Sequence, residues 1–199
     1  MMTKVKTIND LIKIFSKLPS LGPRSAKRII LHLLTKKENL LLPLISLMDD
    51  AYKNIKQCKC CGNLTINDVC DICADKTRQV NTICVVETIA DLWNIETSGV
   101  YNGLYHILGG NLSASEGRNP DDLNIDGLLH RIKGDKIEEV IIATNPTIEG
   151  QTTAFYISDL LQEFKVKITK PALGIPLGSE LNFLDESTLD IAFKNKKEF

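Results

Sequence analysis

Four cysteines place the tightest constraint on what this chain can fold into. Cys58, Cys61, Cys70 and Cys73 follow the spacing C-x2-C-x8-C-x2-C, in which two short turns each present a pair of thiolates to one zinc ion. Gly62 follows the first pair, where such a turn needs a residue that can adopt a positive φ. We therefore predict one structural Zn²⁺ per chain.

Two alternatives accompany this prediction. The cysteines could pair as disulfides, but the chain opens M-M-T-K-V-K without an apolar signal segment, which favours a reduced, cytoplasmic protein. Cys60 could replace Cys61 as a ligand, although only the latter gives both pairs the same two-residue gap. Cys84 lies in an apolar run and is expected to be buried. The polar stretch 63–69 is expected to be a loop.

Charge is distributed unevenly along the chain. The net charge is -1, yet residues 1–37 carry nine basic residues against Asp10 alone, which gives +8 and leaves -9 for the remainder. Clustered positive charge favours a polyanion such as DNA as a partner, although a solvated lysine-rich helix face would leave the same pattern. No apolar run approaches the roughly 18 residues needed to cross a bilayer, so no membrane partner is expected.

Hydrophobic periodicity predicts helices first and a βα pattern afterwards. The early helices are expected at 9–18 with Asn9 as N-cap, at 24–34 after Pro23, and from about Asn39 to Lys56 with Pro43 near its start. Strands are expected at 82–86, 105–108, 139–143 and 166–169. Helices are expected at 89–96, 121–132 and 149–164, with a short one after Asp185. This alternation favours a parallel sheet with helices on both faces.

The segment L-P-S-L-G-P-R-S-A-K-R, residues 18–28, has the form of a helix-hairpin-helix. Such a hairpin can direct backbone N–H groups and the positive end of its second helix at a phosphate. Arg24, Lys27 and Arg28 would add side-chain contacts, so we predict DNA binding without base recognition. Ser20 stands where such hairpins often carry glycine, which predicts a modest conformational cost. A plain helical hairpin is the alternative interpretation.

Acidic and polar residues follow two of the predicted strands. Glu87 ends one strand, with Asp91 soon after it, and Asn145, Thr147 and Glu149 follow another. Parallel strands present their carboxyl ends at one crevice, and paired carboxylates there would hold Mg²⁺ for phosphoryl transfer. Here an amide and a hydroxyl occupy the positions expected for the carboxylate pair. The chain also has no G-x-x-x-x-G-K-[ST] phosphate loop, so a nucleotide hydrolase is not expected.

Taken together, these segments resemble the RecR family of bacterial recombination mediators over nearly the whole chain. The resemblance includes the hairpin and cysteine spacings, I-C-V-V-E at 83–87, G-L-Y-H-I-L-G-G at 103–110, A-T-N-P-T-I-E-G at 143–150 and G-I-P-L-G-S-E-L at 174–181. The chain departs from the family pattern at Ser20, Gln151, Lys170-Pro171 and Ser179. Gln151 stands where an acid is more common, which weakens the case for a metal in the crevice.

The resemblance implies a multidomain α/β fold with four parts. These are a helix-hairpin-helix domain at 1–56, a C4 zinc module at 57–74, a Toprim domain at 79–175 and a C-terminal segment at 176–199. It also implies a DNA-repair mediator without catalysis of its own, which forms a ring-like homo-oligomer in the bacterial cytoplasm at the nucleoid. Its partners would be DNA, RecO and possibly RecF, and its task would be to load recombinase on gapped DNA.

Two roles remain for the crevice. It could be a docking surface in which Glu87, Asp91, Asn145 and Glu149 contact a protein partner, as the acidic body of the chain and the implied RecO partner suggest. Alternatively, the protein could be a Mg²⁺-dependent Toprim nuclease or primase that uses Glu87 and Glu149.

Overall fold

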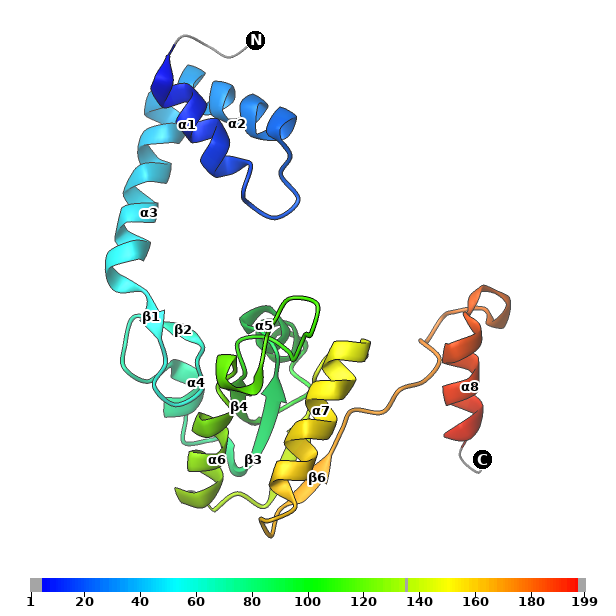
Figure 1. The fold of residues 1–199 in the computed structure, drawn as a ribbon. Coiled ribbons are helices and arrows are strands. Elements are labelled where there is room, and N and C mark those ends of the chain that lie inside the picture. The colour runs from blue at the N-terminus through cyan, green and yellow to red at the C-terminus, as the bar shows by residue number, and fades with distance from the viewer. Residues whose placement is uncertain (1–4, 135, 197–199) are drawn as a thin grey trace. The chain divides into compact units, whose positions relative to one another are not determined.

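The computed structural model describes residues 5–134 and 136–196, which divide into two compact units at the boundary between Ile55 and Lys56 (Figure 1). The first unit is entirely helical. The second contains the cysteine cluster and a parallel sheet flanked by helices, which confirms the predicted fold class. The outermost residues of the predicted first and last domains, 1–4 and 197–199, lie outside the described residues.

The helical unit begins with α1 (Lys6–Phe15) and α2 (Pro23–Thr35). The two helices pack together, and α2 buries Ala26, Ile30 and Leu33. The predicted start of α1 was wrong by about one turn, because the N-cap is Val5 and not Asn9. Ile8 is half-buried like Leu11, Ile12 and Phe15, so it extends the apolar face of the helix toward the N-terminus.

The third predicted helix is divided in two. A π-helical turn η1 (Lys37–Leu41) leads into α3 (Leu42–Asn54), and Pro43 occupies the first turn of α3 as predicted. Proline is tolerated there because the first N–H groups of a helix have no intrahelical acceptor. The helix therefore changes its hydrogen-bond pattern just before the proline.

The second unit opens with the zinc module, which comprises β1 (Lys56–Gln57), β2 (Leu64–Thr65) and α4 (Asp71–Ala74). The two short strands are antiparallel, with Gln57 opposite Leu64. The prediction of a loop throughout 63–69 was therefore wrong for two residues. The tight turn at the first cysteine pair reverses the chain and brings β2 beside β1, where backbone pairing satisfies both strands.

Four parallel strands form the central sheet, in the order β4-β3-β5-β6. Their bounds are Gln79–Val86 for β3, Gly103–Ile107 for β4, Glu139–Ile142 for β5 and Lys167–Thr169 for β6. The connecting helices are α5 (Ile89–Ser98), α6 (Ile125–Gly134) and α7 (Ile148–Leu161), with a short 3-10 turn η2 (Pro120–Asp122) before α6. The predicted order of strands and helices is confirmed, and their ends differ by a few residues.

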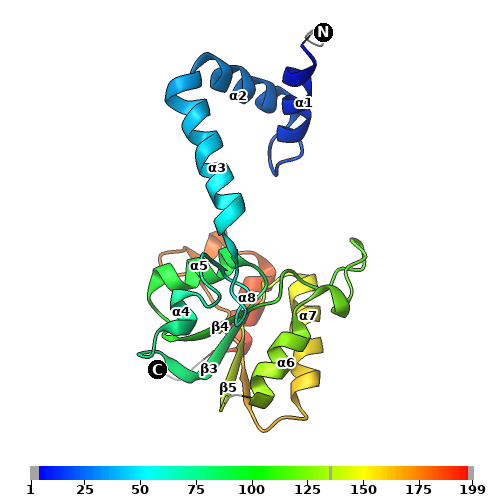
Figure 2. The same cartoon turned by 90° about the vertical axis from the view of Figure 1, so that its left-hand side faces the viewer.

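Alternating side chains of the strands build two apolar cores. Ile83 and Val85 pack with residues of α6 and α7, whereas Cys84 and Val86 pack with Leu92 of α5. Helices α6 and α7 lie on one face of the sheet and α5 lies on the opposite face (Figures 1 and 2). The period of two along a strand sends neighbouring residues to opposite faces, and both faces are covered as in other parallel sheets. Cys84 is buried, as predicted.

After β6 the chain is irregular until η3 (Leu181–Phe183) and α8 (Glu186–Lys194). The predicted helix after Asp185 is confirmed. Asp185 is its N-cap and accepts a hydrogen bond from the backbone N–H of Thr188 at 2.9 Å. Among the described residues, no helix combines the length and the apolar character that a membrane span needs.

Candidate functional site

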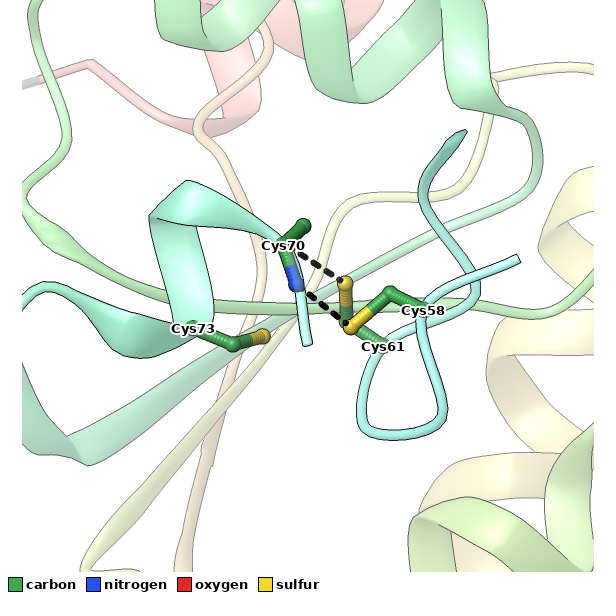
Figure 3. A group of neighbouring side chains, drawn as sticks. All are labelled: Cys58, Cys61, Cys70 and Cys73. Carbon is green, nitrogen blue, oxygen red and sulfur yellow. Dashed lines mark hydrogen bonds between the residues drawn. The ribbon is translucent and has the colours of Figure 1, made fainter. Parts of the chain in front are cut away.

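The four predicted zinc ligands come together in the zinc module (Figure 3). Cys58 and Cys61 lie in the turn between β1 and β2, while Cys70 and Cys73 lie at the start of α4 and within it. Their sulfur atoms all lie within 4.8 Å of one another. Thiolates bound to one tetrahedral zinc at about 2.3 Å would be about 3.8 Å apart, so the four atoms can share one ion.

Backbone N–H groups donate hydrogen bonds to two of these sulfur atoms, as they would to metal-bound thiolates. The N–H of Asn63 donates to Cys61 Sγ at 3.5 Å, and the N–H of Cys70 donates to Cys58 Sγ at 3.3 Å. Gly62 adopts φ 83° in the turn, as predicted, and its N–H donates to the Cys58 carbonyl at 2.9 Å. Cys60 is exposed and lies outside the cluster, so the two-residue gap identified the right pair.

The electrostatics of the cluster also favour a divalent cation. Hydrogen bonding from Cys73, together with the Asn63 N–H, lowers the pKa of Cys61 to about 5 against the effect of burial. Burial and the neighbouring Cys61 charge raise the pKa of Cys70 to about 11. Buried thiolates repel one another in the absence of a counter-charge, and a bound Zn²⁺ removes that penalty. The donor set therefore fits a structural zinc.

The zinc module docks on the sheet and is not a free-standing finger. The N–H of Ile107 donates to the Cys61 carbonyl at 2.9 Å, and Trp93 Nε1 on α5 donates to Asn63 Oδ1 at 3.0 Å. β4 is an edge strand of the sheet, so the module supplies a partner to an otherwise unpaired edge. A Cβ at Gly62 would already touch Ile107 at 3.4 Å.

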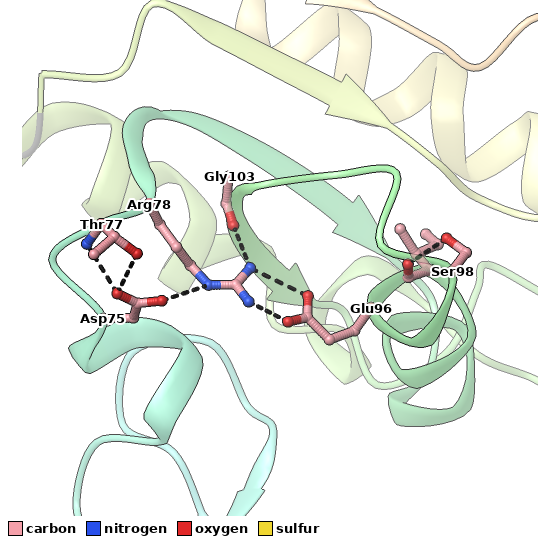
Figure 4. A network of polar contacts seen from close by, with 7 residues as sticks. Asp75, Thr77, Arg78, Glu96, Ser98 and Gly103 are labelled. Carbon is pink, nitrogen blue, oxygen red and sulfur yellow. Dashed lines mark hydrogen bonds and ion pairs between the residues drawn. The ribbon is translucent and has the colours of Figure 1, made fainter.

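A second tie between module and sheet is a polar network around Arg78 (Figure 4). Arg78 Nη1 donates to the Gly103 carbonyl at 3.1 Å, and both terminal nitrogens bond the Glu96 carboxylate of α5. Its Nε lies 3.7 Å from Asp75, just after α4. The Arg78 side chain is only 11% exposed. Sequence analysis missed this network, because Glu96 lies 18 residues away in a separate element.

The hairpin exposes the basic residues predicted to bind DNA. Arg24, Lys27 and Arg28 are exposed on the first turns of α2. Gly22 is the N-cap and provides no side-chain acceptor, so the first N–H groups of α2 are left for another partner. Ser20 adopts φ 61°, the only positive φ among non-glycine residues that the structure describes. A side chain is disfavoured at this φ, which agrees with the predicted conformational cost of Ser20.

At the carboxyl ends of the strands, Glu87 is only 2% exposed and is held by amide donors. The backbone N–H of Asn145 donates to Glu87 Oε1 at 2.7 Å, and the Asn145 side-chain amide donates to Oε2 at 2.9 Å. Asn111 Nδ2 donates to Oε2 at 2.9 Å. We call these three residues the Glu87 cluster. The Glu87 carboxylate therefore accepts its hydrogen bonds from groups of the chain itself.

The other predicted residues of this region serve helix ends or remain partly accessible. Asp91 forms a capping box with Thr88 at the start of α5. Thr147 caps α7 by accepting the Gly150 N–H at 3.1 Å, and Glu149 is half-buried in the first turn of the same helix. The structure therefore brings Glu87 and Asn145 into direct contact. Asn111 was missed, although it follows a predicted strand and could have been found by the same strand-end rule.

Comparison with known proteins agrees with this architecture. The chain is 50% identical over 187 residues to the Recombination protein RecR of Brucella anthropi, which covers 94% of this chain and 93% of that protein. The chain belongs to the RecR family. The proteins of the same name from Brucella canis and Sinorhizobium fredii show the same identity and coverage.

Family models match each part of the chain in turn. They are the RecR helix-hairpin-helix at 8–52, the four-cysteine zinc finger domain of RecR at 55–75, the Toprim domain at 81–172 and the RecR C-terminal part at 174–197. Membership of the RecR family supports a role in recombination repair. The zinc finger match and the cysteine geometry together support a structural zinc.

Proposed function

We propose that this protein is a non-enzymatic mediator of recombinational DNA repair that binds DNA through its hairpin and loads a recombinase on gapped DNA with RecO-type and RecF-type partners. The observation that carries the proposal is the hairpin itself. Uncapped N–H groups at the start of α2 lie beside the exposed Arg24, Lys27 and Arg28. This combination suits a phosphate backbone and carries no base-reading chemistry.

One hairpin would bind weakly, so assembly has a physical purpose. Several hairpins held in a ring-like homo-oligomer would raise the effective concentration of each for the same DNA molecule. The proposed contacts for a protein partner lie at the carboxyl ends of the sheet strands and are Asp91, Asn145 and Glu149. Glu87 is buried, so its proposed role is to position Asn145 for that contact.

The test of DNA binding is Lys27→Ala with Arg28→Ala, measured by fluorescence anisotropy on a labelled duplex over a range of salt concentrations. We expect weaker binding and a salt slope lowered by about one for each phosphate that is no longer neutralised. Lys53→Ala is the matched control, since Lys53 is already paired with Asp49 at 2.5 Å. Wild-type affinity and slope in the double variant would remove the hairpin from the proposal.

The alternative is a Mg²⁺-dependent Toprim nuclease or primase. It is disfavoured because Glu87 already accepts three hydrogen bonds, and because Asn145 and Thr147 are weak Mg²⁺ ligands. The test of this alternative is to incubate the protein with DNA, nucleotides and Mg²⁺ and to measure cleavage and synthesis. Cleavage or synthesis that disappears in Glu87→Gln would establish the enzyme and overturn the mediator.

A further inference from the structure

Helix α2 has two chemically distinct faces over its whole length. Ala26, Ile30 and Leu33 are buried on one side. The opposite side is exposed and basic well beyond the hairpin. It also includes the exposed Leu31. Two further exposed lysines follow the helix, Lys36 as its C-cap and Lys37 at the start of η1. We use the name α2 basic face for the basic residues Arg24, Lys27, Arg28, His32, Lys36 and Lys37.

This face continues without an acidic interruption from the hairpin to the end of the helix. Residues 24, 28, 32 and 36 recur at intervals of four, so they follow one another along the helix surface. Twelve residues of helix span about 18 Å, which corresponds to about five nucleotides of one strand at a rise of about 3.4 Å each. Glu38 is the first acid that follows.

The cations on this face are available for a ligand. Within 5–134 and 136–196, no ion pair of the structure includes Arg24, Arg28, Lys36 or Lys37. At the far end, an open hollow of about 700 Å³ is lined by Lys36 and Lys37 against one acid, Glu38, and the rest of its lining is His32, Leu34, Thr35, Asn39 and Leu40. Unpaired cations around a concave surface attract a polyanion more strongly than scattered ones do.

A simpler explanation exists for the lysines at the far end. Cations near a helix C-terminus stabilise the macrodipole, and the backbone N–H of Lys36 bonds the carbonyls of His32 and Leu33. That cap uses the main chain, however, so it leaves the Lys36 ammonium group free. The two roles can be separated because Lys36→Gln keeps the backbone N–H and removes only the charge.

We propose that the α2 basic face is a continuous binding site for a nucleic-acid phosphate backbone, with Lys36 and Lys37 as contacts remote from the hairpin. The inference rests on the proposed DNA role and extends it. The backbone enters at the hairpin, follows the exposed side of α2 and ends at the junction between α2 and η1. Binding is independent of sequence, since lysine contacts phosphates as a point charge.

The test compares Lys36→Gln/Lys37→Gln with wild type on a labelled single strand of about 30 nucleotides and a duplex of the same sequence. We expect the salt slope to fall by about two on the duplex, and by slightly less on the single strand. The affinity at low salt should fall at least about tenfold. Lys36→Arg/Lys37→Arg should restore both. The matched control is Lys53→Gln/Lys59→Gln, which removes two lysines already paired with Asp49 and Asp68 and should leave the slope unchanged.

The outcomes distinguish this inference from the proposed function. An unchanged slope in Lys36→Gln/Lys37→Gln, with a lowered slope in Arg28→Gln, would confine binding to the hairpin and overturn the extension. Wild-type binding in both would overturn the DNA role as well. A lowered melting temperature with an unchanged slope would assign the lysines to helix stabilisation alone and overturn the extension. Should the double variant fail to fold, the two single variants decide, each with an expected slope change of about one.

Discussion

Two residues of this protein are in locally unfavourable environments: Ser20 has a positive φ in the hairpin, and His106 is buried in the core. Ser20 adopts φ 61°, a left-handed conformation that costs an L-residue about 1 kcal/mol or more in free energy. It is exposed, and the hairpin requires this backbone geometry to turn the chain between α1 and α2. The cost is therefore set by the turn and not by packing.

His106 is a buried residue whose pKa makes the stability of the fold depend on pH. It is fully buried on β4, where Nε2 donates to the Asn124 carbonyl at 2.6 Å and Nδ1 has no partner in the described structure. Burial, aided by the positive charge of Arg131, lowers its pKa to about 4. The unfolded chain therefore takes up this proton at a higher pH than the folded chain does.

We predict that His106 destabilises the fold as the pH falls from about 6.5 toward 4. The full effect is about 3 kcal/mol, from a pKa difference of about 2.5. Urea unfolding across this range should show a flatter pH dependence in His106→Gln, which keeps a donor for Asn124. Comparing the two proteins cancels any loss of zinc in acid, because both carry the same cysteines. Identical pH profiles would contradict the prediction.

At the scale of elements, the zinc module and the α/β sheet form one structural unit. Cys61 and Asn63 of the module bond to β4 and α5, and Arg78 ties the module's exit to the same two elements. These hydrogen bonds join the module to the sheet, where it covers the edge strand β4.

We predict that Arg78→Met lowers the free energy of unfolding by about 3 kcal/mol, because it leaves the half-buried Glu96 without a partner. Arg78→Met combined with Glu96→Met should cost less than the sum of the two single changes, since no charge is then left unpaired. Urea titration monitored by circular dichroism measures both.

An exposed pair provides the control for this comparison. Lys53→Met removes the partner of Asp49, both more than half exposed, and should change stability by less than about 1 kcal/mol. Equal effects at Arg78 and Lys53 would show that the Arg78 network contributes no more than a surface ion pair.

At the scale of the whole molecule, the metal should decide whether the second unit is correctly formed. We predict that Cys70→Ser releases zinc and lowers thermal stability and assembly before it alters DNA contacts, because the cysteines lie in a different unit from the hairpin. Zinc content, melting temperature and solution mass are the measurements. Cys60→Ser is the matched control, since Cys60 lies outside the cluster and this variant should retain the metal. A folded, zinc-free Cys70→Ser protein with normal assembly would contradict this.

Local chemistry was enough to predict the metal site and the order of the strands and helices of the α/β sheet. The spacing of the cysteines, the positive φ at Gly62, the cap at Asp185 and the alternation of strands and helices follow from interactions within a few residues. Where prediction failed locally, at the start of α1 and in β2, the deciding factor was a neighbouring element. Helix α1 begins earlier and includes Ile8, which is half-buried, and β2 exists because β1 lies beside it.

Only the tertiary structure decided what the buried polar groups do. The sequence by itself determined that Glu87 ends a strand and that Asn145 follows another, 58 residues later. Folding brought them together and converted a possible metal ligand into a buried, hydrogen-bonded carboxylate. The docking of the zinc module on β4 and the hydrogen bonds of Arg78 arose in the same way. Such interactions depend on strand order and helix placement, which many residues set jointly and no short motif records.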